Sequence, residues 1–223
     1  MVEKLEVSNS IIVESENDKY FIEAFIDKLN LEIEVENPIC SIDDYKCLGG
    51  YTNLKNKLQE IRFDKITRLG IILDADNIGV KKRVDFINKS LKVVCSDVEL
   101  TKINELKKSK ELDIEIACYI MNIDDKGELE TVLKTIKSEN STYADCLYKW
   151  RDCLKEKSYE ISDKEFDKFW INNYLKFDTC KSNRDRGNKN KYCSNEEAIK
   201  KDIWNFEHPS LTDLKDFLSL FKF

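Results

Sequence analysis

The sequence is short of residues that interrupt regular structure or carry nucleophilic chemistry. Its 223 residues include six glycines, two prolines and one histidine. So few glycines and prolines exclude a long flexible linker or a low-complexity tail, because such segments depend on these residues. The histidine, His208, has no serine or cysteine partner in a recognisable setting, so the sequence predicts no nucleophilic triad.

Long apolar segments are also missing. No run approaches the 18 apolar residues of a membrane span. The charged start Met-Val-Glu-Lys-Leu-Glu lacks the apolar stretch of a signal peptide. There is no P-loop either, so an ATPase function would need a separate chain. We therefore expect a cytoplasmic protein with no membrane partner.

Paired cysteine motifs are absent although eight cysteines are present. No two cysteines have the C-x-x-C spacing of a zinc site or a redox motif. Some lie in apolar or amphipathic runs, which predicts small buried apolar side chains in a reducing compartment. The cysteines are Cys40, Cys47, Cys95, Cys118, Cys146, Cys153, Cys180 and Cys193.

Basic residues are fewer than acidic ones, and the formal net charge is -6. Such a chain does not bind nucleic acid through its overall field, so binding would need a local basic patch. The segment 181–191 is one candidate, since it carries five cations, Arg184 and Arg186 among them, against one acid. The alternative interpretation of this segment is a polar surface loop.

Apolar patterns alternate between strand-like and helical over the first two-thirds of the chain. Continuous apolar runs predict buried strands at 10–14, 67–74 and 114–121, and shorter strands at 31–35 and 39–42. Helical spacing predicts helices over 17–29, 52–61, 80–91 and 129–136. This alternation predicts an α/β fold in which a parallel sheet is flanked by helices on right-handed crossovers.

The pattern becomes helical throughout after about residue 138. We expect an α/β core over 1–138 and an all-helical C-terminal extension over 139–223 that packs on the core. Four apolar stripes are predicted in this extension, which is rich in aromatic residues. The first comprises Tyr143, Cys146, Leu147, Trp150 and Leu154, and the second comprises Phe166, Phe169, Trp170 and Tyr174.

Carboxylates follow the three long predicted strands. Glu14 ends the first, Asp74 and Asp76 end the second, and Glu128 and Glu130 open the helix after the third. Ligands of open parallel sheets bind beyond the carboxyl ends of the strands, so these acids are expected to meet there. Two acids two residues apart in an extended chain point to one side, about 6–7 Å apart. Carboxylates in this arrangement suit Mg²⁺, which also binds water and substrate phosphates.

Most of these acids also have a purely structural interpretation. Ser15 and Asp18 fit a capping box that would begin the first helix. Asp76 suits the N-cap of the next helix. Glu14 has no such alternative, and a carboxylate that leaves a buried strand is costly unless it is paired or metal-bound.

The acids around the third strand are ambiguous in the same way. Glu128 and Glu130 are favoured in a first helical turn by the helix dipole. Glu130 lies off the apolar stripe of its helix, which allows it to face the same crevice as the other acids. Asp124 and Asp125 precede the helix and are expected to be turn residues.

Three segments together resemble the Toprim domain. IIVESEND at 11–18 resembles its hydrophobic strand ending in glutamate, and GIILDAD at 70–76 resembles its D-x-D strand. CYIMNIDDKGELE at 118–130 resembles the G-x-L-E element of small Toprim-like proteins related to OLD-family nucleases. The resemblance spans roughly residues 10–137, with Ser15 where the family has glycine. Neither a topoisomerase tyrosine domain nor a primase zinc ribbon accompanies it.

The resemblance implies a Toprim-like (Rossmann-like) fold and Mg²⁺- or Mn²⁺-dependent cleavage of phosphodiester bonds in DNA or RNA. It implies that Asp74, Asp76 and Glu130 hold the metal. Glu14 would be the general base or acid, or would complete the metal shell. Asp18 and Glu128 would be accessory acids.

Nucleic acid and a separate ATPase chain, as in a two-chain defence system, are the partners that the resemblance implies. Lys81, Lys82 and Arg83 follow the D-x-D motif off the apolar stripe and are candidates for backbone contacts, although an ordinary exposed helix face is the alternative. The alternative function is a non-catalytic Toprim-like module that binds nucleic acid or a partner ATPase. A third interpretation is an unrelated α/β protein whose acids are all helix caps. The sequence predicts no oligomeric state.

Overall fold

The computed structural model of this chain describes residues 8–39, 50–180 and 193–222. Five strands form one sheet in the order β2-β1-β3-β5-β4, and only the β4–β5 pair is antiparallel. This mostly parallel sheet is flanked by helices, which confirms the predicted α/β class. The strands are β1 (Ser8–Ile12), β2 (Glu34–Val35), β3 (Ile66–Asp74), β4 (Lys107–Lys108) and β5 (Glu115–Met121).

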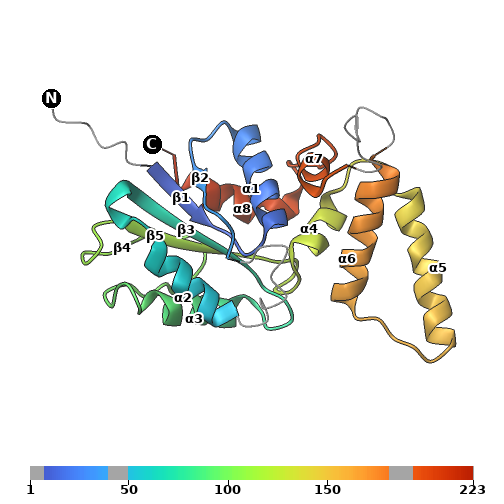
Figure 1. Cartoon of the computed structure of the whole chain (residues 1–223), viewed down its shortest axis with the longest axis horizontal. Helices are drawn as coiled ribbons and strands as arrows, with labels where there is room; N and C mark the ends of the chain where they lie inside the picture. The colour runs from blue at the N-terminus through green and yellow to red at the C-terminus, as the bar shows by residue number, and fades with distance from the viewer. Residues whose placement is uncertain (1–7, 40–49, 181–192, 223) are drawn as a thin grey trace.

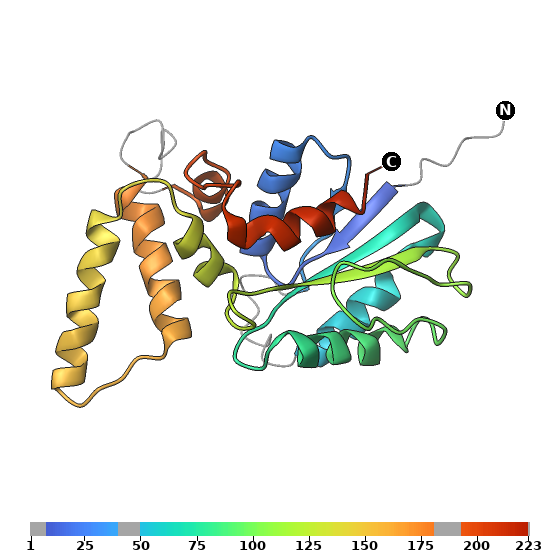
Figure 2. The same ribbon diagram turned by 180° about the vertical axis from the view of Figure 1, so that it is seen from behind.

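Helices cover both faces of the sheet (Figure 1). α2 and α3 lie on one face, and α1 and α8 lie on the other, as the reverse view in Figure 2 also shows. Within the described ranges, no helix combines the length and apolarity that a bilayer crossing requires. The α-helices are α1 (Glu16–Leu29), α2 (Gly50–Glu60), α3 (Val80–Leu91), α4 (Leu129–Ile136), α5 (Thr142–Glu156), α6 (Asp163–Asn173), α7 (Asn195–Ile199) and α8 (Thr212–Ser219). Shorter turns are η2 (Phe63–Lys65), the π-helical η3 (Tyr174–Asp178) and η4 (Pro209–Leu211).

The long strands are buried on both faces, which is why they read as unbroken apolar runs. In β1 and just after it, Ile11 and Val13 join the core beneath α1 and α8, whereas Ile12 joins the core beneath α2 and α3. The predicted bounds of the three long strands therefore agree with the structure to within two residues.

The short strands were predicted less well. The strand predicted at 31–35 is confined to the two residues of β2. Ile39 is not in a strand, and the rest of the strand predicted at 39–42 lies outside the described residues. No pattern in the sequence predicted β4, because its two lysines form no apolar run.

The end of the chain closes one face of the sheet. Asn9 of β1 donates a hydrogen bond from Nδ2 to the carbonyl of Phe221, at 2.6 Å. A Cβ added to Gly70 of β3 would lie 2.8 Å from the Phe221 ring and 3.0 Å from the Phe217 ring. α8 therefore packs so closely on the sheet that β3 needs a glycine beneath it. One continuous core runs from the sheet through α4, α6, α7 and α8.

α5 and α6 form a hairpin that projects from the end of the sheet (Figures 1 and 2). The stripe predicted on α6 is largely confirmed, because Phe166 and Trp170 are fully buried, but Phe169 is 41% exposed. The stripe predicted on α5 is confirmed only in part, because Leu147 packs against the core whereas Tyr143 is 63% exposed and Trp150 is 39% exposed. α5 packs mainly against α6 and η3, so most of its surface faces away from the core.

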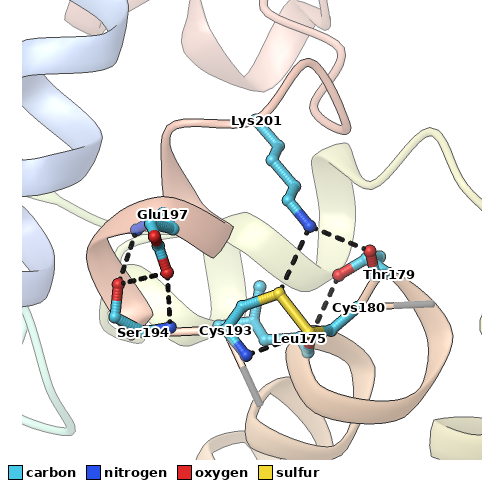
Figure 3. Close-up of a disulfide and its surroundings, with 7 residues drawn as sticks. All are labelled: Leu175, Thr179, Cys180, Cys193, Ser194, Glu197 and Lys201. Atoms are coloured by element: carbon cyan, nitrogen blue, oxygen red, sulfur yellow. Dashed lines mark hydrogen bonds between the residues drawn. A yellow bond between two sulfur atoms is a disulfide. The ribbon is translucent and has the colours of Figure 1, made fainter. Parts of the chain in front are cut away.

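The cysteines also differ from the prediction of reduced, buried side chains. Cys180 and Cys193 form a disulfide with their Cα atoms 6.0 Å apart, and it links the end of η3 to the start of α7 (Figure 3). Cys146 and Cys153 are free thiols but are exposed. Cys95 and Cys118 are free and buried, as expected, and Cys40 and Cys47 lie outside the described residues. Disulfides are typical of oxidising environments, so this pair does not support a reducing compartment.

Candidate active site

The carboxyl ends of β1 and β3 meet at one edge of the sheet. The two strands are parallel neighbours, and Ile12 pairs with Ile71. Two residues beyond β1, Glu14 accepts a hydrogen bond at Oε2 from the backbone N–H of Asp74, at 3.2 Å. The acids predicted to follow these two strands are therefore adjacent.

Asp74, the last residue of β3, also contacts the start of α4. Its Oδ1 accepts a hydrogen bond at 3.2 Å from the backbone N–H of Leu129, the first residue of that helix. The first N–H groups of a helix have no partner within the helix and carry partial positive charge, so they favour a carboxylate. This contact brings Asp74 next to the segment that carries Glu128 and Glu130.

Asp18 lies at the same edge but caps α1. The carboxylate of Asp18 accepts hydrogen bonds from the backbone N–H and the hydroxyl of Ser15, at 2.8 and 2.6 Å, while Ser15 accepts one from the Asp18 N–H. The predicted capping box is thus confirmed. Burial raises the pKa of Asp18 to about 7, and the charges of Glu14 and Glu130 add to the shift while the bonds to Ser15 oppose it.

Five acids form a carboxylate cluster at this edge: Glu14, Asp18, Asp74, Glu128 and Glu130. Burial raises the pKa of Asp74 well above its ordinary value, and the charges of the other four acids raise it further. Burial also raises the pKa of Glu130, as does the charge of Glu128, whereas Lys168 lowers it. Like charges gathered in a poorly solvated place are costly, and a bound cation would relieve that cost.

Asp76 does not share this environment. Its backbone adopts a left-handed conformation (φ 50°) and exchanges two hydrogen bonds with Gly127, at 2.8 and 2.9 Å. The chain is therefore not extended at Asp76, and the same-side geometry expected for the D-x-D motif is not found. The Asp76 carboxylate is ion-paired with Arg83 and Lys164. Burial acts to raise the pKa of Asp76, but the bonds to these two cations outweigh it and lower the pKa.

Asp76 does not cap α3, contrary to the structural alternative. The N-cap residue of α3 is Gly79, and the Val80 N–H donates to Oδ1 of Asp125 at 3.0 Å. Asp124 and Asp125 have positive φ angles of 52° and 70°, which confirms their predicted place in a turn. Their turn fixes the loop after β5 against the start of α3.

Two lysines of α6, which no sequence pattern predicted as site residues, neutralise Glu128. Glu128 is 2% exposed, and its Oε2 lies 3.0 Å from Nζ of Lys164 and 3.3 Å from Nζ of Lys168. Its Oε1 is buried without a hydrogen-bond partner. Lys164 thus bridges Glu128 and Asp76, and these two acids raise its pKa although burial acts to lower it. No local motif predicts this bridge, because Lys164 lies 88 residues from Asp76 in sequence.

The donor chemistry of the carboxylate cluster fits a hard divalent cation, but the present side-chain positions do not form a coordination sphere. In the described ranges, no three His, Cys, Asp or Glu side chains converge closely enough to hold a metal ion. The oxygens instead accept bonds from backbone N–H groups, from Ser15 and from lysines. Mg²⁺ and Mn²⁺ prefer such oxygens, and ligation would require Glu14, Asp74 and Glu130 to rotate toward one another.

A cavity of about 370 Å³ lies beside Asp76 and Glu128, between the sheet edge and the α5–α6 hairpin. Four basic side chains line it: Lys126, Lys134, Arg151 and Lys164. Acids balance them, since Lys134 pairs with Asp167 at 2.7 Å and Arg151 pairs with Asp163 at 2.5 Å. The cavity is therefore polar, with both signs of charge on its walls.

The predicted nucleic-acid contacts are only partly accessible. Lys81 and Lys82 are exposed on α3, which agrees equally with an ordinary helix surface. Arg83 is only partly exposed and pairs with Asp76, so it does not belong to an exposed basic face. Arg184 and Arg186 lie outside the described residues.

The chain matches one family of known proteins. A family model described as "Protein of unknown function (DUF3226)" matches residues 8–222. No curated protein and no solved structure matches the chain.

Proposed function

Because the chain belongs to the DUF3226 family, whose description names no activity, we propose a function from the chemistry of the site. The proposed function is Mg²⁺- or Mn²⁺-dependent cleavage of phosphodiester bonds in DNA or RNA by a Toprim-like domain. The identification with Toprim is part of this proposal and depends on the three motif segments.

The environment of Asp74 carries the proposal. This carboxyl lies between Glu14 and the N-terminus of α4, and four other acids raise its pKa. Helix capping accounts for Asp18, and the N–H of Leu129 at the start of α4 accounts in part for Asp74, but neither contact accounts for Glu14. A purely structural role would leave the mutual repulsion of Glu14, Asp74 and Glu130 only partly offset by these backbone N–H groups.

The roles of the residues follow from their positions. Asp74 and Glu130 would hold the ion, which, when bound, neutralises a phosphate and lowers the pKa of a water molecule. Glu14 is positioned by the N–H of Asp74 and would accept the proton of the attacking water. Asp18 would keep the start of α1 in place through its capping box.

Asp76 requires an exchange of partners before it can bind a metal. Arg83 and Lys164 already balance its charge, so a metal that recruits Asp76 must release at least one of them. A released Lys164 would lie beside the cavity and could contact a phosphate of the substrate. This exchange would couple metal binding to substrate binding.

The net charge of -6 disfavours the approach of a nucleic acid, so binding of the substrate would need local basic residues or a partner protein. Lys81 and Lys82 offer an exposed basic contact, and Arg184 and Arg186 remain candidates for another. A separate ATPase chain would supply what this surface lacks, as for an effector in a two-chain defence system.

A second candidate function is a non-catalytic Toprim-like module that binds nucleic acid or such an ATPase. The full pairing of Asp76 favours it, as does Ser15, which serves as a helix cap where the Toprim signature has glycine. In this case the carboxylate cluster would be a remnant of a metal site.

Cleavage assays test the first candidate. The purified chain would be incubated with Mg²⁺ or Mn²⁺ and with plasmid, single-stranded DNA or structured RNA, with and without a partner ATPase. We expect cleavage that falls at least about 100-fold in Asp74→Asn and in Glu14→Gln. The matched control is Asp113→Asn, because the Asp113 side chain is 93% exposed and precedes β5, whereas the cluster lies beyond the other end of that strand. Equal rates in the parent and in Asp74→Asn would refute the proposal.

Calorimetry separates the two candidates. Titration with Mn²⁺ should give a binding heat that disappears in Asp74→Asn and persists in Asp113→Asn. A non-catalytic module that keeps only a remnant of a metal site should give no binding heat that depends on Asp74. No specific heat and no cleavage would exclude the metal-dependent enzyme.

A further inference from the structure

The α5–α6 hairpin carries exposed aromatic residues along one side. Tyr143 and Trp150 belong to α5, Phe169 to α6 and Phe177 to η3, and the four are 39–63% exposed. They form two pairs across the hairpin, with ring centroids 6.3 Å apart for Tyr143–Phe177 and 5.2 Å apart for Trp150–Phe169. Tyr143 and Trp150 lie seven residues apart, about two helical turns, so they share one face of α5, and the four rings are here called the aromatic strip.

The other side of the hairpin packs against α4. The ring of Tyr148 lies 5.1 Å from Nζ of Lys134 of α4, and the ring of Phe166 lies 5.0 Å from it. α5 itself contributes one fully buried residue, Ala144, to the core. A surface helix normally buries an apolar stripe, but α5 turns only Leu147 of its large apolar side chains against the core and exposes Tyr143 and Trp150. The rings of Tyr143, Trp150 and Phe169 stay 39–63% exposed to solvent.

The spacing of the exposed residues on α5 indicates what would cover them. Tyr143, Cys146, Trp150 and Cys153 follow at intervals of three, four and three residues, and all four are exposed. This is the a/d spacing of a coiled-coil seam, which packs against another helix. Lys149 and Glu156 flank the seam with opposite charges, so the surface lacks the uniform basic character that suits nucleic acid or an anionic membrane.

We propose that the aromatic strip is the contact between two copies of this chain, whose hairpins together form a four-helix bundle. Two-fold pairing requires a self-complementary surface, and α5 has one. When α5 packs antiparallel to α5 of a second copy, Trp150 can pack on Cys153 while Lys149 faces Glu156. Both contacts then occur twice, once on each side of the axis.

The exposed area of the aromatic strip agrees with contact to a second copy of the chain. At roughly 200 Å² for a fully exposed aromatic side chain, the four rings offer roughly 400 Å² of surface. A standard interface buries about 800 Å² per partner, a little over half of it apolar. The hairpin stands clear of the sheet in both views, so a second copy can reach it without contact with β1 or β3 (Figures 1 and 2).

Sedimentation velocity of the full chain tests the proposal. We expect a species with twice the 26.2 kDa mass of one chain. The double substitution Trp150→Glu, Phe169→Glu should raise the dissociation constant at least about 100-fold and yield single chains. A wild-type protein that sediments as single chains up to about 100 µM would overturn the proposal, because a stable dimer binds more tightly than that.

Val93→Glu is the matched control. Val93 is 38% exposed and follows α3 on the sheet side of the molecule, away from the hairpin. It should leave the dimer intact, and circular dichroism should show that all variants are folded. An equal loss of dimer in this control would overturn the proposal, as would a dimer that survives the double substitution.

Cross-linking gives an independent test. A short bismaleimide should link two copies through Cys146 or Cys153, which are exposed free thiols on the proposed seam. The product should disappear in the variant Cys146→Ser, Cys153→Ser. A cross-linked dimer that persists in this variant would place the contact elsewhere and contradict the proposal.

Discussion

Removal of the Cys180–Cys193 disulfide is expected to lower the stability of this protein measurably. The two cysteines are 13 residues apart, and both side chains are buried. Closing a loop of this length in the unfolded chain reduces its conformational entropy by an amount worth about 3 kcal/mol at 25 °C. The substitutions Cys180→Ala and Cys193→Ala together should therefore lower the free energy of unfolding by about 3 kcal/mol. For a chain of this size, that corresponds to a fall in Tm of about 6–12 °C.

Urea unfolding followed by tryptophan fluorescence measures this change. The wild type would be unfolded with and without a thiol reductant, and the double variant would be treated in the same way. The reductant should bring the unfolding midpoint of the wild type down to that of the variant and leave the variant unchanged. The variant thus serves as the control for effects of the reductant elsewhere in the chain. If the reductant leaves the midpoint of the wild type where it was, the disulfide does not stabilise the fold and the reasoning is wrong.

Three further changes follow from the described contacts. The pKa of Asp18 is about 7 in the folded chain against an ordinary 3.8, so its contribution to stability is complete at acidic pH and is lost as the pH rises from about 4 to 7. Urea unfolding of Asp18→Asn across that pH range should lack the fall in the free energy of unfolding that Asp18 causes. An equal fall in the variant and the wild type would contradict the prediction. Gly70→Ala forces a Cβ against the ring of Phe221, so thermal unfolding should show a loss of about 1–3 kcal/mol, and a neutral result would argue against the close packing of α8. Lys164→Met leaves the buried Glu128 with one cation fewer and should cost about 1–3 kcal/mol in urea unfolding. Adding Glu128→Gln should recover part of that loss, and a fully additive second loss would show that the two side chains do not interact.

The parts of the fold set by burial could be predicted from the sequence. β1, β3 and β5 lie between two helical layers, so their apolar runs are continuous and their ends are marked by polar residues. The position of Glu14 beside Asp74 followed from the rule that parallel strands end at one edge. Both results depend on patterns within single segments of the chain.

Features that depend on contacts between distant segments were missed. The ion pairs of Lys164 with Asp76 and Glu128 join α6 to the sheet edge, and neither segment carries a local sign of the other. The stripe on α5 was predicted correctly as a pattern, but spacing alone does not show whether a partner lies within the same chain. The pairing of Cys180 with Cys193 depends on how η3 and α7 pack, which the spacing of eight cysteines does not reveal.

The ion pairs of Lys164 link the acids at the sheet edge to the position of the α5–α6 hairpin. The same ammonium group belongs to α6 and neutralises two acids at the end of the sheet, so neither part can change its arrangement without cost to the other. A ligand that competes with Lys164 for Asp76 also weakens the attachment of α6 to the sheet edge. By thermodynamic reciprocity, a contact that holds α6 in place more strongly lowers the affinity for that ligand, and the two effects are equal in free energy.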